Sequence, residues 1–207
     1  GSTEDLSLGV AALEAFIERF PTHKLASQAH LNIAQSYVHR GRYEDAAKSL
    51  LRFLKDERYQ DRKEIPEARN LLGKSYQMQK KFAEALAAWR EYLAKHPTHD
   101  AWSAVQREVV NTEYLMAEEQ YKAKQYDAAV KLWSEFLAKY PLDSRNPGIF
   151  AKFGWINYRQ KKWDAAIADW RRLVSKYPGT EEASEGQWMI GVTLEEQLGK
   201  LEEALED

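Results

Sequence analysis

One short pattern recurs along the chain: an aromatic residue or leucine, a small residue three positions on, and a large residue four positions after that. Successive copies begin 37, 39, 44, 37 and 38 residues apart. A period in this range is typical of repeat architectures, in which each supersecondary unit stacks on its neighbours. The copies begin at Leu6, Tyr43, Phe82, Tyr126, Trp163 and Leu201, and their small residues are Gly9, Ala46, Ala85, Ala129, Ala166 and Ala204.

The spacing of the pattern places its three residues on one face of a helix. The small residue allows the preceding antiparallel helix to approach closely, and the large residue fills the space beside it. We therefore predict that the large residues Trp89, Trp133 and Trp170 belong to the core. Four copies end at a proline, which cannot continue a helix. These prolines are Pro21, Pro97, Pro141 and Pro178.

A second amphipathic helix precedes each copy and carries a small residue where the two helices should cross. Glycine in a helix interior costs about 1 kcal/mol relative to alanine. Three of the five crossing positions nevertheless hold glycine, which predicts a close approach of the two helices. The crossing residues are Ala34, Gly73, Ala117, Gly154 and Gly191.

These residues, in this register, resemble the tetratricopeptide repeat (TPR). The match is carried by Ile33-Ala34, Tyr37, Gly41, Tyr43 and Ala46, and again by Leu72-Gly73, Tyr76, Phe82, Ala85, Trp89 and Pro97. The resemblance implies an all-α fold, a TPR-like right-handed solenoid of antiparallel helix pairs. It covers nearly the whole chain, so we expect one solenoid over residues 3–207. Its expected units are 3–21 (partial), 25–60, 66–97, 100–141, 147–178 and 181–207 (truncated).

The period exceeds the usual 34 residues of the family, and the extra residues follow the closing prolines. This resembles the longer-loop TPR variety of bacterial cell-envelope proteins, such as the BamD-like lipoproteins and the Tol–Pal-associated coordinators. The resemblance implies a periplasmic or envelope-associated location. The chain ends in an amphipathic helical pattern over residues 201–207 without a stop signal, so we expect it to be a piece of a larger protein. Gly1-Ser2 is typical of a cleaved tag.

Two segments depart from the regular period. Residues 100–124 contain neither proline nor glycine, and we expect one long helix there that gains whole turns and so keeps its packing face. Residues 55–64 are polar and stand where the closing proline should be. We expect this segment to be a loop and a flexible joint.

The composition argues against several classes of function. A formal charge of −2 gives no general support for nucleic-acid binding, and the absence of cysteine excludes thiol nucleophiles and Cys-ligated metal sites. The chain has no phosphate-binding loop, nucleophile elbow or His-Glu-x-x-His motif. We interpret His96 and His99 as loop residues rather than metal ligands, and the pairs Lys80-Lys81 and Lys161-Lys162 as solvated turn residues rather than an edge for an acidic partner. We therefore expect no enzyme activity, no cofactor and no metal.

Repeat stacks bind extended partners on the surface formed by the first helix of each pair. We predict that this groove has an aromatic C-terminal half suited to a peptide with apolar anchors. For Tyr121 and Trp155, packing in the core is an equally good interpretation, and for Trp188 it is the better one. Gln28, Gln35 and His39 belong to the same face in the first half. The candidate partner-binding residues are Asn70, Lys74, Gln77, Asn111, Tyr114, Glu118, Tyr121, Trp155, Tyr158 and Arg159.

The sequence thus predicts a non-enzymatic scaffold that binds a protein or peptide in its groove. We expect no nucleic-acid partner and no direct membrane span, and the fold is compatible with a homo-oligomer. The alternative is a structural spacer, or a docking arm for a domain that is absent from this sequence.

Overall fold

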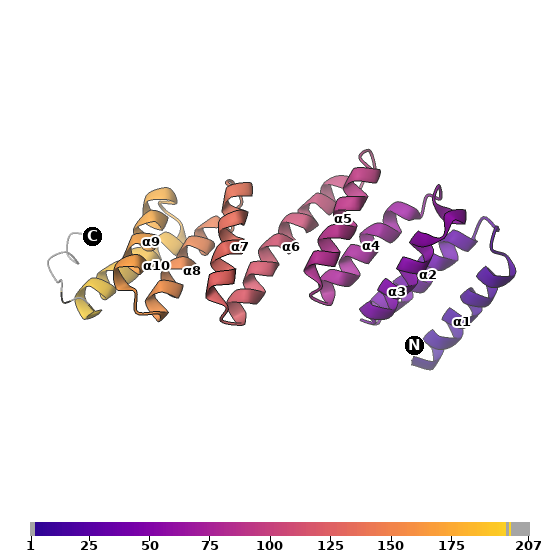
Figure 1. The fold of residues 1–207 in the computed structure, drawn as a ribbon, viewed down its shortest axis with the longest axis horizontal. Helices are drawn as coiled ribbons and strands as arrows, with labels where there is room; N and C mark the ends of the chain where they lie inside the picture. Colours follow the sequence, from indigo (N-terminus) through magenta and orange to yellow (C-terminus); the bar gives the residue numbers. More distant parts are fainter. Residues whose placement is uncertain (1–2, 198, 200–207) are drawn as a thin grey trace. The chain divides into compact units, whose positions relative to one another are not determined.

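The computed structural model describes residues 3–197 and 199, with side chains from residue 7 onward (Figure 1). These residues form ten α-helices and two short helical turns, with no strand among them, which confirms the all-α prediction. The α-helices are α1 (Thr3–Arg19), α2 (Ala26–His39), α3 (Tyr43–Lys55), α4 (Ile65–Met78), α5 (Phe82–Lys95), α6 (Trp102–Lys122), α7 (Tyr126–Lys139), α8 (Asn146–Arg159), α9 (Trp163–Lys176) and α10 (Glu181–Val192). The short turns are the 3-10 turn η1 (Glu57–Tyr59) and the π-helical turn η2 (Thr193–Gln197). The predicted tag residues Gly1-Ser2 and the repeat copy that begins at Leu201 lie outside the described residues.

The chain divides into two compact units, Gly1–Leu115 and Met116–Asp207, here called the N-terminal and the C-terminal unit. In the N-terminal unit, α2 packs on α3, α3 on α4, and α4 on α5. In the C-terminal unit, α8 packs on α9 and α9 on α10. Each packed pair contains one helix of the first kind and one of the second, as the repeat pattern predicts. The long helix that we expected over residues 100–124 is α6, whose 21 residues include the boundary between the units.

The turn inside each helix pair has the same backbone geometry in every copy. The residue two positions before the second helix has a positive φ: 69° at Gly41, 59° at Lys80, 61° at Lys124 and 59° at Lys161. At Lys80 the turn closes with hydrogen bonds from the Lys80 N–H to the Gln77 carbonyl and from the Lys81 N–H to the Tyr76 carbonyl. This is a Schellman C-cap, which places its C′ residue in the left-handed region that glycine tolerates best.

Replacement of the left-handed lysines by glycine should stabilise the C-terminal unit. For a residue other than glycine, the left-handed conformation costs about 1–2 kcal/mol. Glycine avoids this cost, but about half of the gain is cancelled because glycine has the larger conformational entropy in the unfolded chain. We expect Lys124→Gly/Lys161→Gly to raise the free energy of unfolding by about 1 kcal/mol, measured by urea denaturation followed by circular dichroism. Lys162→Gly is the matched control, because the φ of Lys162 is −91° and glycine there should destabilise. Equal effects of the two changes would contradict this account of the turn.

The helix crossings are as close as the glycines predict. A Cβ added to Gly73 would lie 2.5 Å from the Trp89 ring, and one added to Gly154 would lie 2.2 Å from Nε1 of Trp170. These tryptophans and Trp133 are fully buried, which confirms that the repeated large position belongs to the core. The predicted close crossing at Gly191 involves a helix that the sequence predicts over residues 201–207, so it lies outside the described residues.

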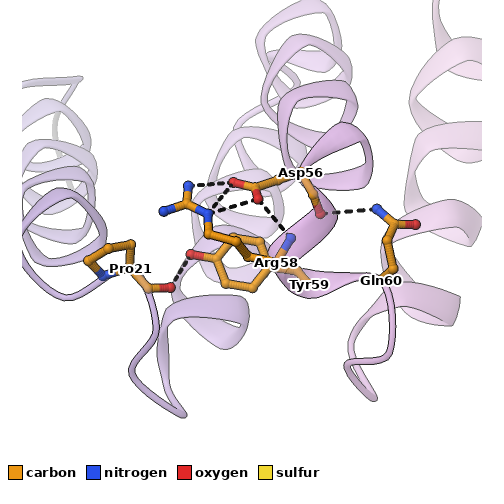
Figure 2. Close-up of polar contacts among 5 residues, drawn as sticks. All are labelled: Pro21, Asp56, Arg58, Tyr59 and Gln60. Atoms are coloured by element: carbon orange, nitrogen blue, oxygen red, sulfur yellow. Dashed lines mark hydrogen bonds and ion pairs between the residues drawn. The ribbon is translucent and has the colours of Figure 1, made fainter.

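The prediction of a flexible joint over residues 55–64 is wrong, because an anchored turn lies within this segment. The side chain of Tyr59 in η1 is 1% exposed, and its hydroxyl donates a hydrogen bond of 2.6 Å to the carbonyl of Pro21 (Figure 2). Beside it, the carboxylate of Asp56 accepts a hydrogen bond of 3.0 Å from the backbone N–H of Arg58 and pairs with its guanidinium. Tyr59 lies one residue after Arg58, which occupies the position of the closing proline in the other copies, and it fixes the loop to the preceding pair.

Candidate protein-binding faces

The candidate residues fall on the first helices of the pairs and divide between the two units. We call the surface on α2, α4 and the first part of α6 the N-terminal face, and the surface on the last part of α6, α8 and α10 the C-terminal face. The N-terminal face carries Asn70, Lys74, Gln77, Asn111 and Tyr114, and the C-terminal face carries Glu118, Tyr121, Trp155, Tyr158 and Arg159.

Amides on the N-terminal face are engaged within the unit. The Asn70 side-chain oxygen accepts a hydrogen bond of 2.9 Å from the indole Nε1 of Trp89. The Gln77 amide donates to the hydroxyl of Thr112 at 2.8 Å, which links α4 to α6. Because these groups hold core residues and neighbouring helices in place, binding of a partner through them would first require breaking internal hydrogen bonds.

The remaining residues of the N-terminal face differ in exposure. The amide of Gln35 donates a hydrogen bond of 2.7 Å to Glu67 and so links α2 to α4, whereas Lys74 and His39 are exposed. Asn111 and Tyr114 on α6 are half-buried. Among the predicted residues of this face, Lys74 and His39 are therefore the ones placed to meet a partner directly.

An ion pair joins α6 to α8 in the middle of the C-terminal face. Nζ of Lys152 lies 2.6 Å from a carboxylate oxygen of Glu118, and both side chains are more than half buried. The ammonium group also lies 5.3 Å from the ring centroid of Trp133. The pair satisfies both charges locally and leaves the aromatic and guanidinium groups around it as the exposed chemistry of the face.

Tyr121 lies between core and surface. Its ring packs 5.5 Å from Trp133 and 5.8 Å from Tyr126, measured between centroids. The exposed guanidinium of Arg159 lies 5.9 Å from the Tyr121 ring, a cation–π arrangement. A hydrogen bond with Tyr126 and the nearby Tyr121 raise the pKa of Arg159, so its positive charge is permanent.

Trp155 and Tyr158 form an aromatic cluster on α8 that continues into the core. The Trp155 ring meets those of Trp170 and Tyr158 edge-on at 5.6 and 5.7 Å, and Tyr158 meets Trp163 at 5.0 Å. The indole N–H of Trp155 donates to Glu185 on α10 at 3.3 Å. Both rings are half-buried, so each supports the fold and shows one edge to solvent.

Trp188 corrects one prediction. The sequence favoured a core position, but the side chain is 65% exposed on α10. Its repeat position, three residues before Gly191, corresponds to that of Asn70 before Gly73, so register alone assigned it to the face. Hydrophobicity was the misleading signal.

The sequence analysis also did not include Lys152 and Glu185 among the residues of the C-terminal face. Helical spacing from Trp155 and Trp188 could have identified them.

The described part of the chain was predicted from sequence to hold neither a metal site nor a membrane span. No group of three or more His, Asp or Glu side chains within it is arranged to hold a metal ion. The hydroxyl of Tyr92 lies 2.8 Å from Nδ1 of His99, which gives this loop histidine a structural contact. No described helix is both long and apolar enough to cross a bilayer.

The chain consists of helix pairs in register, whose helices cross closely at glycines and whose first helices carry the candidate faces. This arrangement defines an all-α helical-repeat protein. Tetratricopeptide repeat family models match residues 2–63, 67–99, 112–143 and 152–180, more than half of the chain. The chain belongs to the tetratricopeptide repeat family. Because these repeats are an interaction fold, it belongs to the class of protein–protein interaction scaffolds. The family matches do not distinguish the long-period envelope variety.

Several solved structures are similar to the chain. BtubC from P. vanneervenii is 14% identical over 98% of this chain and 85% of that one, with a TM-score of 0.43. MamA of AMB-1 is 18% identical over 89% and 88%, with a TM-score of 0.44. MamA from Desulfovibrio magneticus RS-1 is 18% identical over 87% and 89%, with a TM-score of 0.41. No curated protein sequence matches the chain.

Proposed function

We propose that the chain binds an extended segment of a protein partner and that the C-terminal face makes the principal contacts. The observation that carries the proposal is the composition of this face, which holds the exposed side chains of Trp188 and Arg159 and the half-buried rings of Tyr121 and Trp155. Tryptophan, tyrosine and arginine are the residues that most often dominate the energy of protein interfaces. The N-terminal face offers mainly amides that already have partners in the fold.

The mechanism is presentation of a surface that is formed before binding. The contacts between Trp155 and Trp170 and between Tyr121 and Trp133 fix these rings, so little side-chain freedom is left to lose when a partner arrives. Apolar side chains of the partner would pack on Trp188 and the ring edges. Arg159 would donate hydrogen bonds to backbone carbonyls or a carboxylate of the partner.

Peptide selection tests the proposal and does not require the natural partner. Peptides would be selected from a random display library on the full chain, and their Kd would be measured by fluorescence anisotropy. We expect Trp188→Ala and Arg159→Ala each to weaken binding by about tenfold or more, because interface hot spots are worth about 2 kcal/mol. Both side chains are exposed, so circular dichroism should show unchanged folding.

Leu142→Ala is the matched control. Leu142 is also an apolar residue of the C-terminal unit, is 97% exposed and lies in the turn between α7 and α8, away from the face. Its replacement should leave the Kd unchanged. Selected peptides whose affinity is insensitive to both Trp188→Ala and Arg159→Ala would contradict the proposal and favour the alternative function of a structural spacer.

A further inference from the structure

The histidines of the chain are confined to one of its two units. All five, His23, His30, His39, His96 and His99, lie in the N-terminal unit, and residues 116–207 contain none. Histidine is the side chain whose ordinary charge change falls between pH 5 and 8. The two units therefore differ in the groups that respond to mild acid.

His30 on α2 is packed between aromatic rings. Its ring stacks on Phe53 of α3 at 4.9 Å and meets Tyr59 edge-on at 5.1 Å. Its Nε2 atom is buried and has no hydrogen-bond partner. A proton on this nitrogen would place an unpaired charge among rings, which costs free energy.

The charged groups around His30 are of both signs. Glu14 and Glu18 on α1 line the same pocket as the imidazole, together with Arg52 on α3. Asp56 and Arg58 flank it from the end of α3 and from η1. Burial is the largest influence on the pKa of His30 and lowers it; Asp56 opposes this change, and Arg52 and Arg58 add to it.

His96, at the end of α5, lies beside a buried arginine. Its ring meets Tyr92 edge-on at 5.5 Å, and its Nε2 is buried without a partner. Arg69 on α4 is 5% exposed, pairs with Glu91 at 3.1 Å, and has an unpartnered Nε. A proton on His96 would add a second positive charge beside a guanidinium that cannot release its own.

The neighbours of His96 mostly oppose its protonation. Burial lowers the pKa of His96 most, and Arg69, His99 and Lys95 lower it further, whereas Glu91 acts in the opposite direction. Glu91 already pairs with Arg69 and with Lys95, at 3.1 and 2.7 Å. Little of its negative charge is left to stabilise a histidinium.

The other two loop histidines act as hydrogen-bond acceptors. Nδ1 of His23 accepts from the backbone N–H of Leu25 at 3.2 Å, before α2. Nδ1 of His99 accepts from the N–H of Ala101 at 3.3 Å, before α6, and lies 2.8 Å from the Tyr92 hydroxyl. These two contacts with backbone N–H groups help to fix the starts of α2 and α6.

At the positions equivalent to the histidines, the C-terminal unit has groups whose charge state does not change in mild acid. The residue two after the closing proline is Asp143 or Thr180, and each accepts a backbone N–H at 3.0 and 3.2 Å. The Asp143 pKa is lowered mainly by its hydrogen bond from Arg145. The position of His96 holds tyrosine at 140 and 177, and that of His30 holds Phe150.

We propose that the N-terminal unit loosens on mild acidification through His30 and His96, whose buried Nε2 atoms lie among aromatic rings, while the C-terminal unit keeps its structure. Acidification would therefore weaken the N-terminal face and leave the aromatic C-terminal face in place. This effect is independent of the proposed function, because it concerns folding of the first unit and not binding of a peptide.

The direction of the effect follows from proton linkage. A histidine whose pKa is lowered in the folded state binds fewer protons there than in the unfolded chain. The stability that the neutral His30 and His96 contribute is therefore complete well above the ordinary pKa of 6.5 and is lost as the pH falls below it. We expect the loss between pH 7.5 and 5.5.

Hydrogen exchange measured by mass spectrometry on the full chain tests the proposal, with rates corrected for the intrinsic pH dependence. We expect protection of peptides from α2 to α5 to fall several-fold between pH 7.5 and 5.5. Peptides from α8 and α9 should keep their protection and serve as the internal control. An equal change in both units, or none in the first, would overturn the proposal.

Variants of the histidines test whether these residues, rather than a general instability of the N-terminal unit, cause the loss of protection in acid. His30→Phe and His96→Tyr introduce the residues of the C-terminal unit at these positions. Each should reduce the acid-dependent loss of protection at α2 to α5. His39→Gln is the matched control, since His39 is exposed and should leave the loss unchanged. A full acid effect that persists in both His30→Phe and His96→Tyr would overturn the assignment to these histidines.

Discussion

We expect Gly73→Ala to lower the free energy of unfolding by about 2 kcal/mol, although alanine is the better helix former. The added Cβ would lie 2.5 Å from Cε2 and Nε1 of Trp89, a ring with no exposed surface and no room to move. Overpacking of this kind costs about 1–3 kcal/mol, and the hydrogen bond from Trp89 to Asn70 would be disturbed as well. The gain in helix propensity, about 1 kcal/mol, offsets only part of this. Urea denaturation measures the difference.

Gly9→Ala is the matched control for Gly73→Ala. Gly9 is also a helical glycine of the N-terminal unit, on α1, and an added Cβ there meets nothing within 4 Å. We expect Gly9→Ala to stabilise by up to about 1 kcal/mol through propensity alone. If the two changes had the same sign, the crossing would not be the reason for the glycine.

A second substitution can show that the effect comes from the contact with Trp89. In the preceding pair, the crossing residue is Ala34 and the large position holds Leu50, and both are fully buried. Gly73→Ala combined with Trp89→Leu reproduces that pairing. We expect the double variant to be less destabilised than the sum of the single variants by about 1 kcal/mol or more, as contacting residues usually show. Additivity would contradict the direct contact.

Tyr59→Ala should destabilise the N-terminal unit by about 3 kcal/mol, the second large effect that we expect. Removal of a buried aromatic ring costs about 3–5 kcal/mol, and this ring packs on Phe53 at 5.5 Å and on His30 at 5.1 Å. Tyr59→Phe keeps the ring and removes only the hydrogen bond to the Pro21 carbonyl, so it should cost about 1 kcal/mol. Urea denaturation followed by circular dichroism measures both.

Arg58→Ala provides the comparison within the same turn. Its side chain is about half exposed and its pairing with Asp56 is screened by solvent, so we expect a change within about 0.5 kcal/mol. A similar small effect of Tyr59→Ala would restore the interpretation of residues 55–64 as a loose joint. Greater loss on Tyr59→Phe than on Tyr59→Ala would equally contradict the anchored turn.

The repeat frame and its core could be predicted from sequence because they depend on periodic, local signals. Gly73, Gly154 and the three core tryptophans recur at fixed spacing, and spacing on a helix determines which side chains share a face. The turn lysines were also placed correctly by register. Their left-handed backbone was not predicted, because lysine does not signal this conformation, unlike the glycines at the equivalent positions 41 and 199.

The predictions that failed depend on contacts between residues distant in sequence. Tyr59 reaches Pro21, 38 residues earlier, and nothing in its polar neighbours marks it as buried. Trp188 has the hydrophobicity of a core residue but the register of a surface one, and register was the better guide.

The contact between Asn70 and Trp89 has a consequence for how the chain can acquire new specificity. Asn70 stands at a position where a repeat protein would vary its side chains to recognise a new ligand, yet its amide caps a core indole. Mutation there changes recognition and folding at once. Lys74, Arg159 and Trp188 have exposed side chains on the same kind of face, so a randomised library placed on them would sample new partners while leaving the repeat packing intact.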